Sequence, residues 1–269
     1  MNADSAFLIG TTHAVCQDYS IAINTASSSY VIVSDGCSTS PHTDIGARLL
    51  VQAAVQIIRR SGKEILASLS EEASRLALEW AHCLGLTSQS VDATLLAAYS
   101  DGDDLIISAT GDGVIVLEPK EGPTEVYSIA FPSGFPLYPA YIHQSERLGA
   151  WRANKQAYKE VRRFKGSLSE PVESRQSTCA SETFRFKAND FKRVTLISDG
   201  VHSFYKTQQS HTSKQLSPVP LDQILEELIS FKGGTGSFVA RRLQKLKRTL
   251  FAKNTHHLDD LSVATLYLG

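Results

Sequence analysis

The chain has 269 residues, 42% of them hydrophobic and 20% charged, with a formal net charge of −1. This length and apolar content argue against an intrinsically disordered chain and are enough for one large domain with its own core, or at most two small ones. We predict a single domain over residues 1–269. A nearly neutral charge gives no general attraction to nucleic acid or membranes, so we expect neither as a partner.

The four cysteines form no C-x-x-C pair, so the sequence gives no sign of a structural zinc site. Their scatter along the chain suits a reducing compartment. No apolar run approaches the ~20 residues of a membrane span. The first residues also lack the basic side chains that begin a secretory signal. We therefore expect a cytoplasmic protein.

The first third of the chain predicts three short strands followed by two helices. Strands are expected over 6–12, 19–26 and from Tyr30, where β-branched residues cluster, and together they suggest an antiparallel start. Apolar residues then recur at helical spacing over 44–60 and again from 68 or 70 to 84.

The middle of the chain predicts a β-meander followed by an irregular segment. The spacing of the alternating runs gives strands over 92–99, 105–110, 114–118 and 125–131. Prolines and glycines then interrupt the pattern. Within 131–180 we predict a basic helix over 147–165 and a polar, irregular stretch over 167–181. We interpret this segment as an insertion, or flap, over the working edge of the sheet.

The last third predicts strands, two helices and a closing strand. The strands are 182–187, the run from Val194 and 261–268, the helices are 221–231 and 238–251, and 208–220 is a polar loop. The final helix is basic but lacks interleaved aromatic residues, which argues against nucleic-acid binding. The element order predicts an α+β fold of four layers, αββα: a central antiparallel β-sandwich flanked by pairs of antiparallel helices.

Several of these strands end on aspartate and glycine. This pair is a strong hairpin signal, which explains Asp101-Gly102 between two predicted strands. No returning strand follows Asp35-Gly36 or Asp199-Gly200, so for these two we favour a binding site over a simple turn. Strand signals on both sides of Asp112 favour a hairpin there.

The acidic residues beside strand ends form a candidate site. They are Asp18, Asp35, Asp112, Asp199 and Asp259 or Asp260. Neighbouring antiparallel strands begin and end beside one another, so these side chains can gather at one rim. Clustered carboxylates repel unless cations neutralise them, and oxygen-only ligands indicate Mg²⁺ or Mn²⁺. Two such ions imply hydrolysis of a phosphate ester by an activated water.

The order of these motifs resembles the metal-dependent protein phosphatases of type 2C (the PPM family), in its bacterial-type branch. The similarity runs from about residue 7 to residue 268. The motifs that carry it are Gln17-Asp18, Val33-Ser34-Asp35-Gly36, Gly46-Ala47, Ala93-Thr94, Gly111-Asp112, Ile197-Ser198-Asp199-Gly200 and Asp259-Asp260-Leu261-Ser262-Val263.

The resemblance implies a role for each of the acidic motifs. Asp35 would bridge two Mn²⁺ or Mg²⁺ ions, and Gly36 would lend its carbonyl oxygen. Asp199 and Asp259 would be the other direct ligands, and Asp18 would hold metal-bound water. Asp112 would help to hold a third, weaker metal.

Four positions depart from the family pattern, and one of them is Cys16, where asparagine is frequent. His13 stands where many members have a phosphate-gripping arginine, and it is charged only near or below pH ~6.5 and lacks the bidentate fork. Cys37 stands where many members have a histidine proposed as general acid, and a thiol can also donate a proton. Ser203 replaces a further acidic ligand, which argues against a third metal.

The leading hypothesis is therefore a phosphatase acting on phosphoserine and phosphothreonine in proteins. Its expected partners are a phosphorylated substrate protein and a cognate Ser/Thr kinase, in a signalling role, and we expect a monomer. Two alternatives stay open: a pseudophosphatase that binds a partner without catalysis, and a two-metal hydrolase of small phosphate esters.

Overall fold

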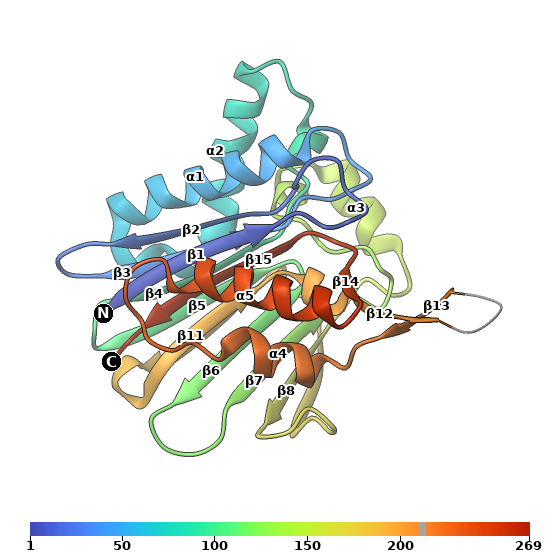
Figure 1. Cartoon of the computed structure of the whole chain (residues 1–269). Coiled ribbons are helices and arrows are strands. Elements are labelled where there is room, and N and C mark those ends of the chain that lie inside the picture. The colour runs from blue at the N-terminus through green and yellow to red at the C-terminus, as the bar shows by residue number, and fades with distance from the viewer. Residues whose placement is uncertain (210–213) are drawn as a thin grey trace.

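The computed structural model describes residues 1–209 and 214–269, and its centre is a pair of stacked antiparallel sheets (Figure 1). The five-stranded sheet has the order β10 (Ser181–Lys187), β5 (Asp104–Thr110), β4 (Leu95–Ser100), β3 (Ser29–Ser34), β2 (Tyr19–Asn24). The seven-stranded sheet has the order β1 (Asn2–Leu8), β15 (Leu261–Tyr267), β11 (Phe191–Ile197), β6 (Gly113–Pro119), β7 (Glu125–Ala130), β8 (Lys159–Lys165), β9 (Glu173–Ser177).

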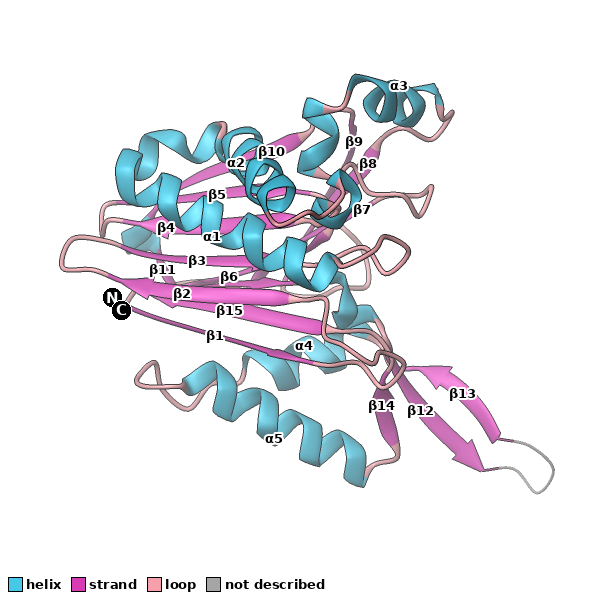
Figure 2. Cartoon of the chain, turned by 90° about the horizontal axis from the view of Figure 1, so that it is seen from above, coloured by secondary structure: helices cyan, strands magenta, loops and turns pink. Residues whose placement is uncertain are grey.

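Strand β3 shows why the five-stranded sheet is covered on both faces. Its residues alternate, as a strand requires. Val31 and Val33 pack in the core between the two sheets, whereas Tyr30 and Ile32 pack against the helices outside. Those helices are α1 (Thr43–Ser61) and α2 (Leu69–Cys83), which lie together on this face in Figure 2. An uninterrupted apolar strand therefore marks a sheet buried on both sides.

A second helix pair covers the seven-stranded sheet. Helices α4 (Leu221–Ile229) and α5 (Phe238–Ala252) pack on its outer face, where Val114, Ile197 and Val263 join their apolar side chains. The three apolar clusters separate four layers, helix–sheet–sheet–helix, so the predicted αββα sandwich is confirmed. None of the helices in the described residues combines the length and apolar character needed to cross a membrane.

Two predicted strand neighbours are wrong. Strand β1 pairs with β15 in the seven-stranded sheet rather than with β2. The chain also leaves one sheet for the other between β5 and β6, so Asp112 is not in a hairpin and the predicted meander is broken there. Gly111 and Gly113 adopt φ of 90° and 140° at this crossing, a backbone that suits glycine. Alternation identifies a strand, but it does not identify the partner.

The segment after β7 differs most from expectation. The predicted helix over 147–165 is wrong in its second half, because α3 (Ser145–Ala153) ends early and β8 follows. Lys159 and Val161 are buried while Arg162 is exposed, and the ammonium of Lys159 lies 3.3 Å from Glu182. Basic residues occur on both faces of this strand, so its sequence lacks the apolar–polar alternation that would predict a strand. The stretch predicted as irregular also contains β9.

The predicted loop over 208–220 is also partly wrong. A small third sheet has the order β13 (Lys214–Pro218), β12 (Phe204–Gln209), β14 (Thr255–His257), so the loop contains a strand. Residues 210–213 of that prediction lie outside the described residues. Polar, partly exposed strands give little apolar alternation, which explains why the sequence reads as a loop.

Candidate active site at one end of the sandwich

Strand register brings the acidic motifs to one end of the sandwich. Tyr19 pairs with Ser34, so Asp18 before β2 lies next to Asp35 after β3. In the other sheet Ile197 pairs with Val263, so the Asp199 turn and the Asp259-Asp260 turn are neighbours. The predicted gathering of these residues follows directly from antiparallel pairing.

Asp18 joins the ends of the two sheets. Its Oδ2 accepts hydrogen bonds from the hydroxyls of Ser198 and Ser262, both at 2.7 Å. The Ser198 hydroxyl in turn accepts from the amide of Ser262 at 2.9 Å. Asp18 is fully buried, and burial raises the pKa of its carboxyl to about 7. The sequence singled out both serines as parts of motifs, but it did not reveal that they hold Asp18.

The Asp35 turn is held by backbone contacts on both sides. Asp35 donates its amide to the Thr94 hydroxyl at 3.0 Å, and its carbonyl accepts from the Thr94 amide at 2.8 Å. Gly36 donates to the carbonyl of Gln17 at 3.2 Å. A Cβ on Gly36 would lie 2.8 Å from the Thr43 carbonyl oxygen, so the turn requires glycine. The Asp35 carboxylate is thereby presented from a rigid support.

The carboxyl groups in this cluster perturb one another. Burial raises the pKa of Asp35 well above its usual value, and the charges of Asp18 and Asp199 raise it further. Burial followed by the charge of Asp199 raises the pKa of Asp112 to about 8 and also raises that of Asp259. Asp18, Asp35, Asp112, Asp199 and Asp259 are therefore close enough to share one electrostatic environment.

The donor set fits a hard divalent cation. Within the described residues no donor reaches the buried Oδ1 of Asp18, and the neighbouring groups are carboxylates. A buried oxygen without a partner and several unneutralised carboxylates favour a cation. In the same residues, however, no three His, Cys, Asp or Glu side chains stand together as a complete ligand set. The cluster consists of carboxylate oxygens, which are hard ligands, but within the described residues they do not form a complete metal-binding set.

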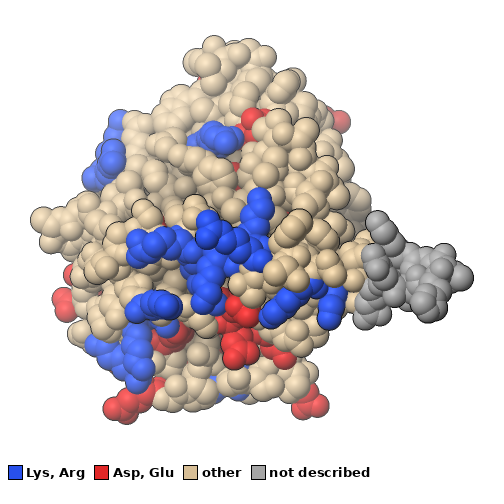
Figure 3. All heavy atoms as spheres, in the orientation of Figure 1, with Lys and Arg blue, Asp and Glu red and all other residues tan. Residues whose placement is uncertain are grey.

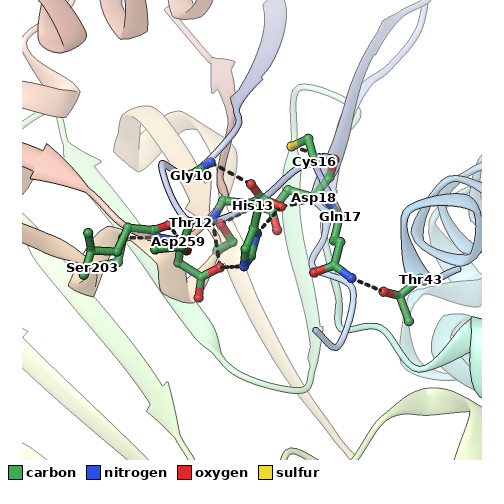
Figure 4. A network of polar contacts seen from close by, with 12 residues as sticks. Gly10, Thr12, His13, Cys16, Gln17, Asp18, Thr43, Ser203 and Asp259 are labelled. Atoms are coloured by element: carbon green, nitrogen blue, oxygen red, sulfur yellow. Dashed lines mark hydrogen bonds and ion pairs between the residues drawn. The ribbon is translucent and has the colours of Figure 1, made fainter. Parts of the chain in front are cut away.

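Asp260 has a different role from Asp259. Its buried carboxylate accepts from the amides of Gly10 at 2.7 Å and Gln17 at 2.6 Å, and it lies 2.9 Å from His13 Nδ1. Asp259 is 45% exposed, and its Oδ1 lies 3.6 Å from His13 Nε2. Figure 4 shows the His13 ring reaching toward Asp259 and the side chain of Gln17 holding Thr43. Asp260 thus fixes the loop between β1 and β2.

Replacing Asp260 by alanine is expected to destabilise the fold. The amides of Gly10 and Gln17 would lose their acceptor, at about 1–3 kcal/mol for each donor left without one. We expect the free energy of unfolding, measured in urea, to fall by about 3 kcal/mol. Asp222→Ala is the matched exposed control and should cost no more than about 1 kcal/mol. An equal loss of unfolding free energy in both variants would contradict this anchoring role of Asp260.

Neighbouring groups shift the pKa values of His13 and Cys37, two of the positions that depart from the family pattern. Burial lowers the pKa of His13, but the hydrogen bond and charge of Asp260 outweigh it, so the pKa is raised. Burial raises the pKa of the Cys37 thiol, but the hydroxyls of Thr39 and Tyr138 outweigh it and lower the pKa. The Cys37 sulfur lies 3.1 Å from the Thr39 hydroxyl.

An ion pair fixes the segment 131–180 beside the Cys37 turn. Arg147 on α3 donates to both carboxylate oxygens of Asp92, at 2.8 and 2.6 Å, and stacks over Tyr141. Asp92 is buried, and its carbonyl accepts from the Cys37 amide at 2.8 Å. Burial, followed by contact with Cys37, raises the pKa of Tyr138. The sequence did not single out Asp92, Tyr138, Tyr141 or Arg147 for a functional role.

The chain is a layered αββα sandwich with an acidic cluster at one end, and comparisons with known proteins identify its family. A family model described as Protein phosphatase 2C matches residues 10–250. The chain therefore belongs to the protein phosphatase 2C family, as the sequence motifs predicted. A search of curated proteins gives no match.

Solved structures share the fold at low sequence identity. A bacterial serine phosphatase matches with a TM-score of 0.58 and 12% identity, over 100% of this chain and 98% of its own. The serine/threonine phosphatase Stp1 from Staphylococcus aureus matches with a TM-score of 0.56 and 11% identity, over 99% and 95%. A serine/threonine phosphatase of S. agalactiae gives 0.53 and 14%, over 99% of each chain.

Proposed function

We propose that the protein is a metal-dependent phosphoprotein phosphatase that hydrolyses phosphoserine and phosphothreonine with Mn²⁺ or Mg²⁺. The observation that carries the proposal is the carboxylate cluster, in which Asp35 has its pKa raised by burial and by Asp18 and Asp199. Such a cluster is destabilised by its own charge and is stabilised by cations. The solved structures that share the fold include serine and serine/threonine phosphatases, which supports this substrate class.

The proposed roles follow the family motifs. Asp35, the carbonyl of Gly36, Asp199 and Asp259 would hold two cations, Asp18 would hold metal-bound water, and Asp112 could serve a third ion. The chemistry that bound cations supply is polarisation of phosphate oxygens and activation of water. The protein's part is to fix the carboxylates: Ser198 and Ser262 orient Asp18, and Thr94 orients the Asp35 turn.

Metal-dependent turnover tests this proposal. Purified protein stripped with a chelator should hydrolyse a phosphothreonine peptide only after Mn²⁺ or Mg²⁺ is restored, and it should prefer this peptide to nucleotides. A preference for nucleotides would favour a hydrolase of small phosphate esters. The incomplete ligand set supports keeping the pseudophosphatase as a second candidate. Calorimetric Mn²⁺ binding without any turnover would favour that candidate.

His13 is proposed to contact the substrate phosphate. Its ring is held by Asp260 through Nδ1, which leaves Nε2 near the exposed Asp259. His13→Ala is expected to raise KM several-fold, with a smaller fall in kcat, because a ground-state contact to phosphate would be lost. Steady-state kinetics on the phosphothreonine peptide checks this. Unchanged values of both constants would remove the role.

Cys37 is proposed to donate a proton to the leaving group. Alkyl leaving groups need this proton more than aryl ones, so Cys37→Ala should slow the phosphothreonine peptide by about tenfold or more while slowing nitrophenyl phosphate much less. Cys83→Ala, at an exposed cysteine, is the control and should leave both rates unchanged. Equal slowing of the two substrates would argue for a structural role of Cys37.

The remaining proposals concern organisation and partners. We treat residues 1–269 as one phosphatase domain in which 131–180 acts as a flap that helps to choose the phosphoprotein. The Arg147–Asp92 pair supports this, because it ties the segment to the Cys37 turn. A Ser/Thr kinase that phosphorylates the substrate, a monomeric state, a signalling role and a cytoplasmic location belong to the same proposal.

A further inference from the structure

A large cavity lies between α4 and α5, on the outside of the seven-stranded sheet. Its volume is about 820 Å³, within the range typical of small-molecule sites. None of the acidic residues of the candidate active site lines it. In Figure 3 basic side chains gather in the middle of the face that carries these two helices in Figure 1, beside a smaller acidic group.

The cavity has apolar walls. Ile224, Phe231, Phe238 and Leu250 contribute to its lining, and the two phenylalanine rings meet edge to face with centroids 5.3 Å apart. Burial of an apolar or aromatic ligand body against such walls is favourable at roughly 25 cal/mol per Å². The cavity can therefore accept more than an inorganic ion.

The charged lining is strongly unbalanced. Its basic members are Lys206, Lys232, Arg241, Arg242, Lys245 and Lys253. Its acidic members are Glu226 and Glu227, which leaves an excess of four positive charges. Glu227 lies 3.3 Å from Arg242 and 3.9 Å from Lys253. Among the described residues no carboxylate forms an ion pair with Lys206, Lys232 or Lys245. Most of this charge is therefore uncompensated.

Arg242 gives an independent reason to expect an anion. Its side chain is only 9% exposed, and within the described residues its Nε–H has no hydrogen-bond partner. A buried guanidinium with an unsatisfied donor is costly, since the desolvated charge is only partly compensated by one carboxylate at 3.3 Å. The guanidinium belongs to the cavity lining, so an anionic group in the cavity would lie against this incompletely compensated charge.

We propose that the cavity between α4 and α5 binds a small organic anion that has a flat apolar body and at least two negative charges. The apolar walls would take the body, and Arg242, Lys232 and Lys245 would take the charges. A volume of about 820 Å³ matches the size of a small-molecule site, which favours a small molecule over an acidic protein segment. The site is separate from the carboxylate cluster, so its occupancy is measured without any assay of phosphatase activity.

The flat fluorescent dye 8-hydroxypyrene-1,3,6-trisulfonate, whose three sulfonates are negatively charged, is a suitable probe for the full chain. Its fluorescence anisotropy should rise to saturation at one site in the micromolar range. Lys232→Glu with Lys245→Glu should weaken binding by at least about tenfold, equivalent to about 1.4 kcal/mol. Lys247→Glu with Arg248→Glu is the matched control. It makes a charge change of the same size at two exposed residues of α5 that do not line the cavity. It should weaken binding less than about twofold.

Three results would overturn the proposal. The probe could show no saturable binding. The two double variants could lose equal affinity, which would indicate attraction to overall charge. Finally, a short oligoglutamate peptide could bind with sensitivity to Lys232 and Lys245 while the pyrene probe does not, which would assign the face to an acidic protein segment. Circular dichroism and thermal unfolding of each variant confirm that a loss of binding does not reflect unfolding.

Discussion

Replacing Asp35 by asparagine is expected to abolish Mn²⁺-dependent hydrolysis of an aryl phosphate, with kcat falling by at least about 1,000-fold. The proposed mechanism depends on cations that this carboxylate would help to hold. Loss of several kcal/mol of metal-derived stabilisation of the transition state corresponds to a fall of this size, at about tenfold per 1.36 kcal/mol. Asparagine has nearly the same shape but lacks the charge, so packing at the turn is kept.

Two further measurements make the Asp35 result specific. Calorimetry should show that Asp35→Asn binds Mn²⁺ more weakly, while its unfolding midpoint is unchanged or higher, because one of several repelling carboxylates is removed. Asp103→Asn, at the exposed tip of the β4–β5 hairpin, is the matched control and should keep full activity. Retained turnover in Asp35→Asn would rule out the two-metal mechanism.

Gly46→Ala is expected to lower the free energy of unfolding by about 3 kcal/mol or more, as overpacking against rigid backbone does. Gly46 lies in the first turns of α1, where alanine would ordinarily stabilise the helix by about 1 kcal/mol. Here a Cβ would lie 1.5 Å from the carbonyl oxygen of Ser90, which is buried in the 3₁₀ helix Ser88–Val91. The clash therefore exceeds the gain in helix propensity.

Gly149→Ala provides the same substitution in another helix without the clash. No atom lies within 4 Å of a Cβ added at Gly149 in α3, so this variant should be neutral or more stable by up to about 1 kcal/mol. Urea unfolding of both variants measures the difference. Equal stability of the two would mean that α1 does not approach Ser90 so closely.

The Gly46 contact also bears on the candidate active site. The 3₁₀ helix that α1 touches leads directly into Asp92, whose carbonyl accepts the Cys37 amide and whose carboxylate accepts from Arg147. A displacement of this helix would thus reach both the Asp35–Cys37 turn and the segment 131–180. We expect Gly46→Ala to lower phosphatase activity as well as stability.

Much of the fold could be predicted from the sequence, because the burial of each layer imposes a local pattern of apolar residues. The uninterrupted apolar run of β3 marks burial on both faces, and the helical spacing over 44–60 marks α1. The ordered Asp-Gly motifs identified the family, which the match over residues 10–250 bears out. Strand β8 was predicted as part of a helix because lysine and arginine occupy both of its faces.

The sequence by itself determined most of the strands and helices, their apolar faces, and the carboxylates that stand at strand ends, because these depend on near neighbours. Tertiary structure alone decided the pairing of β1 with β15, the crossing between sheets at Asp112, and the basic cavity between α4 and α5. It also decided that Asp18 is held by Ser198 and Ser262, which are 180 and 244 residues away in the chain. Residue periodicity records whether a side chain is buried, but it carries no record of the partner against which it is buried.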